Sequence, residues 1–88
     1  MSYDLLFSKQ ALSDIEFHKK AGKKVILNKL LILLSEIAEH PFDGSGKPEP
    51  LKYALKGCWS RRISREHRLI YEVSSNSVHI LSALGHYE

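Results

Sequence analysis

The 88-residue sequence contains a single cysteine, Cys58, and no long hydrophobic run. One cysteine excludes a disulfide within the chain, and such sparse use is typical of the reducing cytosol. The longest strictly apolar run, Leu30 to Leu34, is far too short to cross a bilayer. The first residues lack the basic region and the apolar core of a signal peptide. We therefore expect a cytoplasmic protein without membrane association, forming one domain over residues 1–88.

The sequence also lacks a recognisable metal or cofactor motif. Its five histidines show no paired ligand spacing, and the lone cysteine has no partner for a zinc site. No glycine loop of the Walker type occurs, and no serine lies in a nucleophile-elbow context. We expect neither a metal nor a cofactor. An enzyme built from this chain would use its own side chains and the reactive atoms of its substrate.

Positive charge is concentrated in one quarter of the chain. The segment from Lys47 to Arg68 carries seven Lys/Arg and two Glu, a net charge of +5, whereas the rest carries a net charge of −2. Such concentration suggests a polyanionic partner, although a solvated basic sheet face is the alternative interpretation.

Hydrophobic patterning separates helices from strands along the chain. The expected elements are a strand at 3–7, helices at 9–20 and 23–39, a short edge strand at 50–53, and strands at 58–63, 67–73 and 78–84. Ser8 is a candidate cap for the first helix, and Gly22 a candidate terminator. This β-α-α-β-β-β-β order predicts an α+β fold, with two N-terminal helices on one face of a twisted, mainly antiparallel sheet.

Each expected helix has a face that should pack on the sheet. The first presents Ala11, Leu12 and Ile15; the second presents Leu27, Leu30, Leu31, Leu34, Ile37 and Ala38. Val25 and Ile32 lie almost opposite that second face. We favour their packing against the first helix, the alternative being a docking strip for another protein.

Strand alternation sorts the basic side chains. If Leu69, Tyr71 and Val73 face the helices, Arg68 points to the open face, where Arg62 can join it. Arg61 has the wrong parity for that face unless a bulge intervenes. Together with Glu49, which Pro48 and Pro50 hold in an extended segment, these arginines form a candidate site.

The residue types suit phosphodiester chemistry on RNA, which carries its own nucleophile in the 2′-hydroxyl group. Glu49 could act as the base, Arg62 and Arg68 could clamp the phosphate, and His86 could protonate the leaving oxygen. Tyr87 could stack on a base or donate its hydroxyl. Taken singly, each residue has an ordinary structural explanation, and only the combination points to catalysis.

The run GSGKPEPLKYALKGCWSRRISREHRLIYEV, with the ending GHYE, resembles the YoeB/Txe family of bacterial toxins in the RelE superfamily. The resemblance covers nearly the whole chain. It implies a small RelE-like fold and a ribosome-dependent mRNA endonuclease that inhibits translation. It also implies a YefM-like antitoxin partner, with which the toxin could bind operator DNA.

The resemblance also assigns roles to individual residues. It makes Glu49 the general base, Arg68 the group that stabilises the scissile phosphate, His86 the general acid and Tyr87 a substrate-positioning residue. The expected substrate contacts are Lys52, Arg61, Arg62 and Arg65. The chain departs from the family pattern by one residue, Glu88, which follows the terminal His-Tyr pair.

Two other functions remain open on this sequence. One is a non-catalytic toxin similar to ParE, which shares the fold and acts by binding gyrase. The other is a binding module whose main role is operon repression with its antitoxin. The combination of Glu49, Arg68 and His86 favours the enzyme, because a protein that only binds would not need all three.

Overall fold

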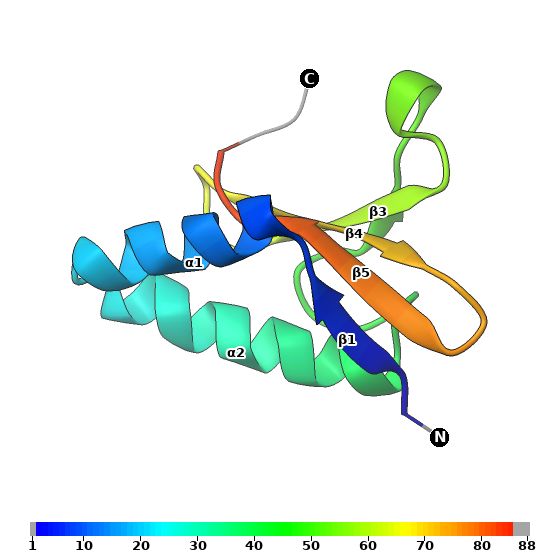
Figure 1. Ribbon diagram of the computed structural model, residues 1–88, viewed down its shortest axis with the longest axis horizontal. Coiled ribbons are helices and arrows are strands. Elements are labelled where there is room, and N and C mark those ends of the chain that lie inside the picture. The colour runs from blue at the N-terminus through cyan, green and yellow to red at the C-terminus, as the bar shows by residue number, and fades with distance from the viewer. Residues whose placement is uncertain (1, 86–88) are drawn as a thin grey trace.

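Two helices pack on one face of a mixed five-stranded sheet in the computed structural model, which describes residues 2–85 (Figure 1). The elements are β1 (Asp4–Phe7), α1 (Lys9–Lys20), α2 (Lys24–Glu39), β2 (Glu49–Pro50), β3 (Cys58–Arg62), β4 (Arg68–Val73) and β5 (Ser77–Ser82). A short 3-10 helix, Tyr53–Leu55, lies between β2 and β3. The predicted β-α-α-β-β-β-β order and α+β class are confirmed.

The strands lie in the order β1-β5-β4-β3-β2. Strands β2 to β5 pair antiparallel with their neighbours, whereas β1 pairs parallel with β5. The two helices follow β1 directly. The next strand, β2, lies at the opposite edge of the sheet, and β3, β4 and β5 then follow in order toward β1. The last strand, β5, therefore lies between β1 and β4, and the C-terminal segment leaves the sheet from an interior strand.

The first helix has the bounds that its sequence predicts. The Ser8 hydroxyl oxygen accepts a hydrogen bond from the Ala11 N–H at 3.0 Å and donates to the Leu81 carbonyl at 2.9 Å. One side chain thus caps α1 and joins it to the end of β5. Gly22, with a φ of +68°, follows the helix in the left-handed conformation that glycine tolerates best.

A single apolar layer lies between the helices and the sheet. Its buried members include Ala11, Leu30, Leu33, Leu34, Ile37, Leu69, Tyr71, Val78 and Ile80. Val73 packs against the same cluster, so the predicted orientation of Leu69, Tyr71 and Val73 is confirmed. A smaller cluster of Leu51, Cys58 and Ile70 forms on the other face of the sheet.

The helices expose more apolar surface than predicted. Leu31, expected in the core, is 65% exposed, and Leu12 of α1 is also exposed. Val25 and Ile32 are 82% and 52% exposed, so the favoured prediction that they pack against α1 is wrong. The apolar residues of α2 extend around more of the helix than the sheet and α1 can cover.

The expected edge strand at 50–53 is shorter and begins one residue earlier. Tyr53 adopts a φ of +58°, which ends extended geometry and begins the 3-10 turn. One further hydrogen bond, from the Leu51 N–H to the Cys58 carbonyl at 2.9 Å, continues the pairing with β3. Within residues 2–85, no helix is long and apolar enough to cross a membrane.

Candidate active site

Three strands bring a carboxylate and two arginines to the sheet face opposite the helices. Arg62 of β3 is paired with Arg68 of β4, and Glu49 of β2 is paired with Ser60 of β3. Directly paired residues project to the same face, and Ser60 and Arg62, two apart, share it. The prediction that Arg62 and Arg68 share the open face is therefore confirmed, and Glu49 lies on it with them.

These side chains line a cavity of about 140 Å³. The lining residues are Gly46, Lys47, Glu49, Ser60, Arg62 and Arg68. Three cations and one carboxylate give the lining a net positive charge, which suits an anion such as a phosphate group. Among residues 2–85, no salt bridge involves Glu49, Arg62 or Arg68. Arg68 Nη1 donates one long hydrogen bond, of 3.4 Å, to the Ser64 carbonyl, so most of the guanidinium donors at the cavity are not taken up by acidic side chains.

One wall of the cavity depends on a close approach between two backbone segments. The Arg62 N–H donates to the Gly46 carbonyl at 2.6 Å. A Cβ added to Gly46 would lie 2.9 Å from the Arg62 carbonyl oxygen and 3.1 Å from Leu33 Cδ2, and Gly46 has a φ of +82°. Glycine is therefore required here on both steric and conformational grounds. This contact brings Lys47 and the following Glu49 against β3.

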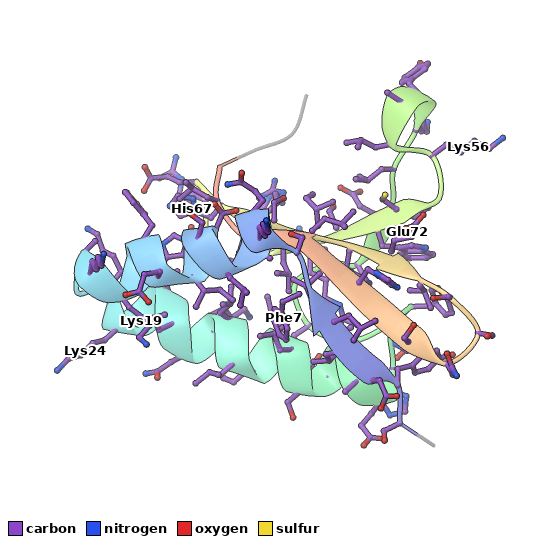
Figure 2. The ribbon with its side chains drawn as sticks, in the orientation of Figure 1. Phe7, Lys19, Lys24, Lys56, His67 and Glu72 are labelled. Carbon is purple, nitrogen blue, oxygen red and sulfur yellow. The ribbon has the colours of Figure 1, made fainter. Side chains whose placement is uncertain are left out.

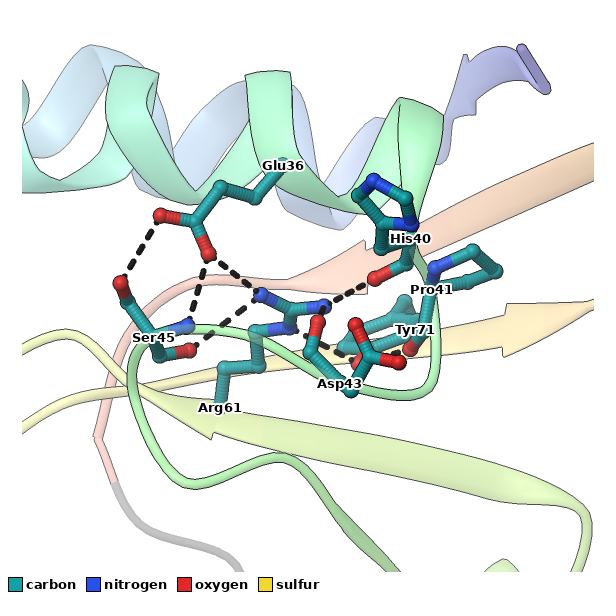
Figure 3. Close-up of polar contacts among 7 residues, drawn as sticks. All are labelled: Glu36, His40, Pro41, Asp43, Ser45, Arg61 and Tyr71. Carbon is teal, nitrogen blue, oxygen red and sulfur yellow. Dashed lines mark hydrogen bonds and ion pairs between the residues drawn. The ribbon is translucent and has the colours of Figure 1, made fainter. Parts of the chain in front are cut away.

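Arg61, next to Arg62 in the chain, points the other way and is fully buried (Figure 3). Its Nε donates to the Tyr71 hydroxyl at 3.1 Å, and its Nη1 donates to Glu36 Oε1 at 3.2 Å. The remaining guanidinium hydrogen bonds go to the carbonyls of Ser45 (3.2 Å), His40 (2.5 Å) and Asp43 (2.7 Å). We call this set, with the Tyr71 hydroxyl donating to the Pro41 carbonyl at 2.7 Å, the Arg61 network.

The Arg61 network corrects the expectation that Arg61 contacts substrate. Strand alternation directs this side chain toward the helices, as its parity indicates, and its donors are occupied by protein acceptors. Two hydrogen bonds from Ser45, and to a lesser degree Arg61, lower the pKa of Glu36 despite partial desolvation. Burial raises the pKa of Tyr71. Arg61 therefore joins the end of α2 and the following loop to the sheet beneath the cavity.

The other predicted site residues are placed differently. Lys52 and Arg65 are exposed and do not line the cavity. His86 and Tyr87 lie outside the described residues. Sequence reasoning did not assign Lys47 or Ser60 to the site. Ser60 could have been assigned to the site because it lies two residues from Arg62 on the same strand and so shares its face. Nothing in the sequence indicated Lys47 except its position in the basic segment.

A larger cavity, of about 360 Å³, lies where β1 meets the loop after α2 and the turn before β5. Its charged lining residues are Glu39 and Asp43, with no arginine or lysine. That charge is unsuited to phosphate, so the smaller cavity is the better candidate for polyanion chemistry. In the described part of the chain, no group of three or more His, Cys, Asp or Glu residues could hold a metal ion.

Comparison with known proteins identifies the family of the chain. Residues 7–87 match the family described as YoeB-like toxin of bacterial type II toxin-antitoxin system. "Toxin YoeB" of Synechocystis sp. is 42% identical over 84 residues, covering 91% of this chain and 98% of that protein.

Two solved structures have closely similar folds. The YoeB/ParE toxin from Agrobacterium tumefaciens superposes with a TM-score of 0.88 at 34% identity, covering 96% of this chain and 99% of that one. The toxin in the YoeB-YefM complex from Staphylococcus aureus gives a TM-score of 0.85 at 39% identity, covering 99% and 100%. Because the family match and the relatives span nearly the whole chain, this protein belongs to the YoeB-like toxins of bacterial type II toxin-antitoxin systems.

Proposed function

We propose that this toxin is a ribosome-dependent endoribonuclease, which cleaves mRNA in the ribosomal A site and thereby inhibits translation. The observation that carries the proposal is that Glu49, Arg62 and Arg68 line the same cavity. A base beside paired guanidinium groups can promote intramolecular attack by a 2′-hydroxyl, because it takes the proton while the cations stabilise the growing negative charge.

The proposed reaction uses the ribose as nucleophile. Glu49 takes the proton of the 2′-hydroxyl, whose oxygen then forms a bond to the adjacent phosphorus. Arg62 and Arg68 donate forked hydrogen bonds to the non-bridging oxygens as negative charge grows on them. The bond from phosphorus to the 5′-oxygen breaks, and His86 supplies the proton to that oxygen. The products are a 2′,3′-cyclic phosphate and a free 5′-hydroxyl.

Exposed cations beside the cavity would extend the contact along the RNA. Lys52 and Arg65 are exposed, and we assign them to the phosphates of the mRNA or of the ribosomal RNA. Lys47, which lines the cavity, joins them. Tyr87, next to the proposed acid, would position the substrate. Each exposed phosphate contact should make binding weaker as salt increases.

The proposed protein partner is a YefM-like antitoxin, as in the complex from Staphylococcus aureus. An acidic segment of such a partner would neutralise the cations of the cavity and keep RNA out. Through the antitoxin, the pair would also reach operator DNA.

Single-turnover cleavage on programmed ribosomes, with mapping of the new RNA ends, tests the activity. Cleavage should stop when the attacking ribose is replaced by 2′-deoxyribose, because the nucleophile is then missing. Unchanged cleavage of the deoxy substrate would contradict the mechanism. Failure to cleave any ribosome-bound mRNA, with tight binding to gyrase instead, would favour the ParE-like alternative.

A further inference from the structure

The segment that follows β5 is held on one side by buried polar groups of α1 and on the other by partly buried groups at the start of β4. It comprises residues 83–85 and leads directly into His86. In Figure 1 this red segment lies beside the yellow turn between β3 and β4.

The first anchor comes from α1 and holds Ala83. Its N–H donates to Asp14 Oδ2 at 2.9 Å, and its carbonyl accepts from His18 Nε2 at 2.9 Å. Asp14, His18 and Ala83 are all buried. The second oxygen of Asp14 accepts from Gln10 Nε2 at 2.7 Å. Burial of a carboxylate and an imidazole is unfavourable unless both form hydrogen bonds. Here both groups form a hydrogen bond with the backbone of Ala83, so this residue is held in one position.

The second anchor comes from the start of β4 and holds Gly85. Its N–H donates to His67 Nδ1 at 2.8 Å, and its carbonyl accepts from the Arg68 N–H at 2.9 Å. Because an N–H can only donate, His67 Nδ1 is unprotonated in this contact. Gly85 has a φ of +75°, and it turns the chain beside the residue whose side chain lines the cavity.

The two anchors form one unit because their histidine rings touch. The rings of His18 and His67 meet edge to face, with centroids 4.8 Å apart and planes at 72°. Figure 2 shows His67 beside α1, near the point where the C-terminal segment leaves the sheet. The Ala83 carbonyl requires a proton on His18 Nε2. Within residues 2–85, Nδ1 of this buried ring has no hydrogen-bond partner, so hydrogen bonding holds the ring through Ala83 alone.

We propose that Asp14, His18 and His67 are positioning residues, which hold residues 83–85 against α1 and the start of β4 and thereby limit the positions that His86 can take. The proposal rests on the proposed function, in which His86 is the general acid. Such an acid must lie within hydrogen-bond reach of the leaving oxygen, and a displacement of about 1 Å can reduce the rate about 100-fold. Anchors at Ala83 and Gly85 limit that displacement.

Paired substitutions at each histidine separate the hydrogen bond from the ring volume. His67→Leu removes the acceptor, whereas His67→Asn can place an amide oxygen where Nδ1 lies. His18→Leu removes the donor, whereas His18→Gln can place an amide N–H where Nε2 lies. His79→Leu, on the exposed side of β5, is the matched control. If one leucine variant does not fold, comparison of the leucine and amide variants at the other histidine still tests the proposal.

Two measurements are made on the full chain. Single-turnover cleavage should be about 100-fold slower in the leucine variants, with unchanged affinity for programmed ribosomes, and within about 5-fold of wild type in the amide variants. NMR relaxation and amide exchange should show the backbone of residues 83–85 becoming more mobile in the leucine variants only.

Each outcome has a defined meaning. Unchanged backbone order at residues 83–85 in both leucine variants would overturn the anchoring. Increased mobility with wild-type cleavage would overturn the positioning role. If the wild-type chain does not cleave at all, the proposed function fails and the catalytic purpose with it, while the NMR comparison still decides whether the anchors order the segment.

Discussion

The adjacent residues Arg61 and Arg62 should respond in opposite ways to the same substitution. Arg61→Met removes a buried guanidinium that satisfies the Tyr71 hydroxyl, Glu36 and three backbone carbonyls. Removing one partner of a buried ionic network costs about 3–5 kcal/mol. The Glu36 side chain is 31% exposed and keeps its two hydrogen bonds from Ser45, so we expect the lower end, about 3 kcal/mol.

For a domain of this size, 1 kcal/mol corresponds to about 4–8 °C in Tm, so Arg61→Met should lower the Tm by roughly 12–24 °C. Arg62→Met is the control, because that side chain is exposed and should change stability by about 0.5 kcal/mol or less. Arg61→Lys keeps the charge but not the fork, and should fall between wild type and Arg61→Met.

Thermal melts and urea titrations of the three variants measure stability, and cleavage is assayed at a temperature where all are folded. Arg61→Met should keep most of its cleavage activity there, whereas Arg62→Met should lose most of it. A melting temperature for Arg61→Met within about 3 °C of wild type would refute the role given to the Arg61 network.

Three further predictions concern single groups. Glu49→Gln should slow cleavage by about 10²–10⁴-fold with an unchanged Tm, and wild-type cleavage would remove Glu49 as the base. The folded pKa of Glu36 is below 4.5, so the unfolded chain takes up the proton first as the pH falls. The stability that Glu36 contributes is therefore complete above about pH 4.5 and lost as the pH falls through the folded pKa. Urea midpoints between pH 7 and 3 should fall less steeply for Glu36→Gln, and equal slopes would contradict this. Burial, with a smaller effect of Glu72, raises the pKa of the Cys58 thiol above 9.0, so iodoacetamide should label it at pH 8 only after unfolding. Rapid labelling of the folded chain would show that the thiol is accessible.

Much of the fold was predictable because local signals agree with the tertiary structure. The bounds Lys9–Lys20 follow from a capping serine and a terminating glycine, and both act within a few residues of the chain. Strand alternation likewise predicted that Arg62 and Arg68 share a face, since a period of two needs no knowledge of distant contacts. Alternation also indicated the inward direction of Arg61, and the expectation of a substrate contact went against that signal.

Features that depend on distant contacts were not predictable. Leu31 belongs to an apolar pattern, but its exposure depends on how far the sheet and α1 extend over α2. Lys47 reaches the cavity because the Gly46 carbonyl meets the Arg62 N–H, a contact between segments 16 residues apart. No local pattern encodes that approach. The anchors at Ala83 and Gly85 are of the same kind, because Asp14 lies 69 residues from its backbone partner.

The way Arg61 holds the loop after α2 bears on which substitutions this loop can accept. Its bonds to the loop go to the carbonyls of His40, Asp43 and Ser45, which every amino acid provides. A Cβ at Gly44, by contrast, would lie 2.5 Å from Glu36 Oε1 and 2.9 Å from Arg61 Nη1. The side chain at an exposed position such as Asp43 can therefore vary without moving the backbone. Gly44 is restricted, because its φ of +122° is strained for any residue with a Cβ, and that Cβ would displace Glu36 or Arg61 from their hydrogen bonds. Substitutions at the exposed positions of this loop should therefore change its surface chemistry while the hydrogen bonds of Arg61 keep its backbone in place.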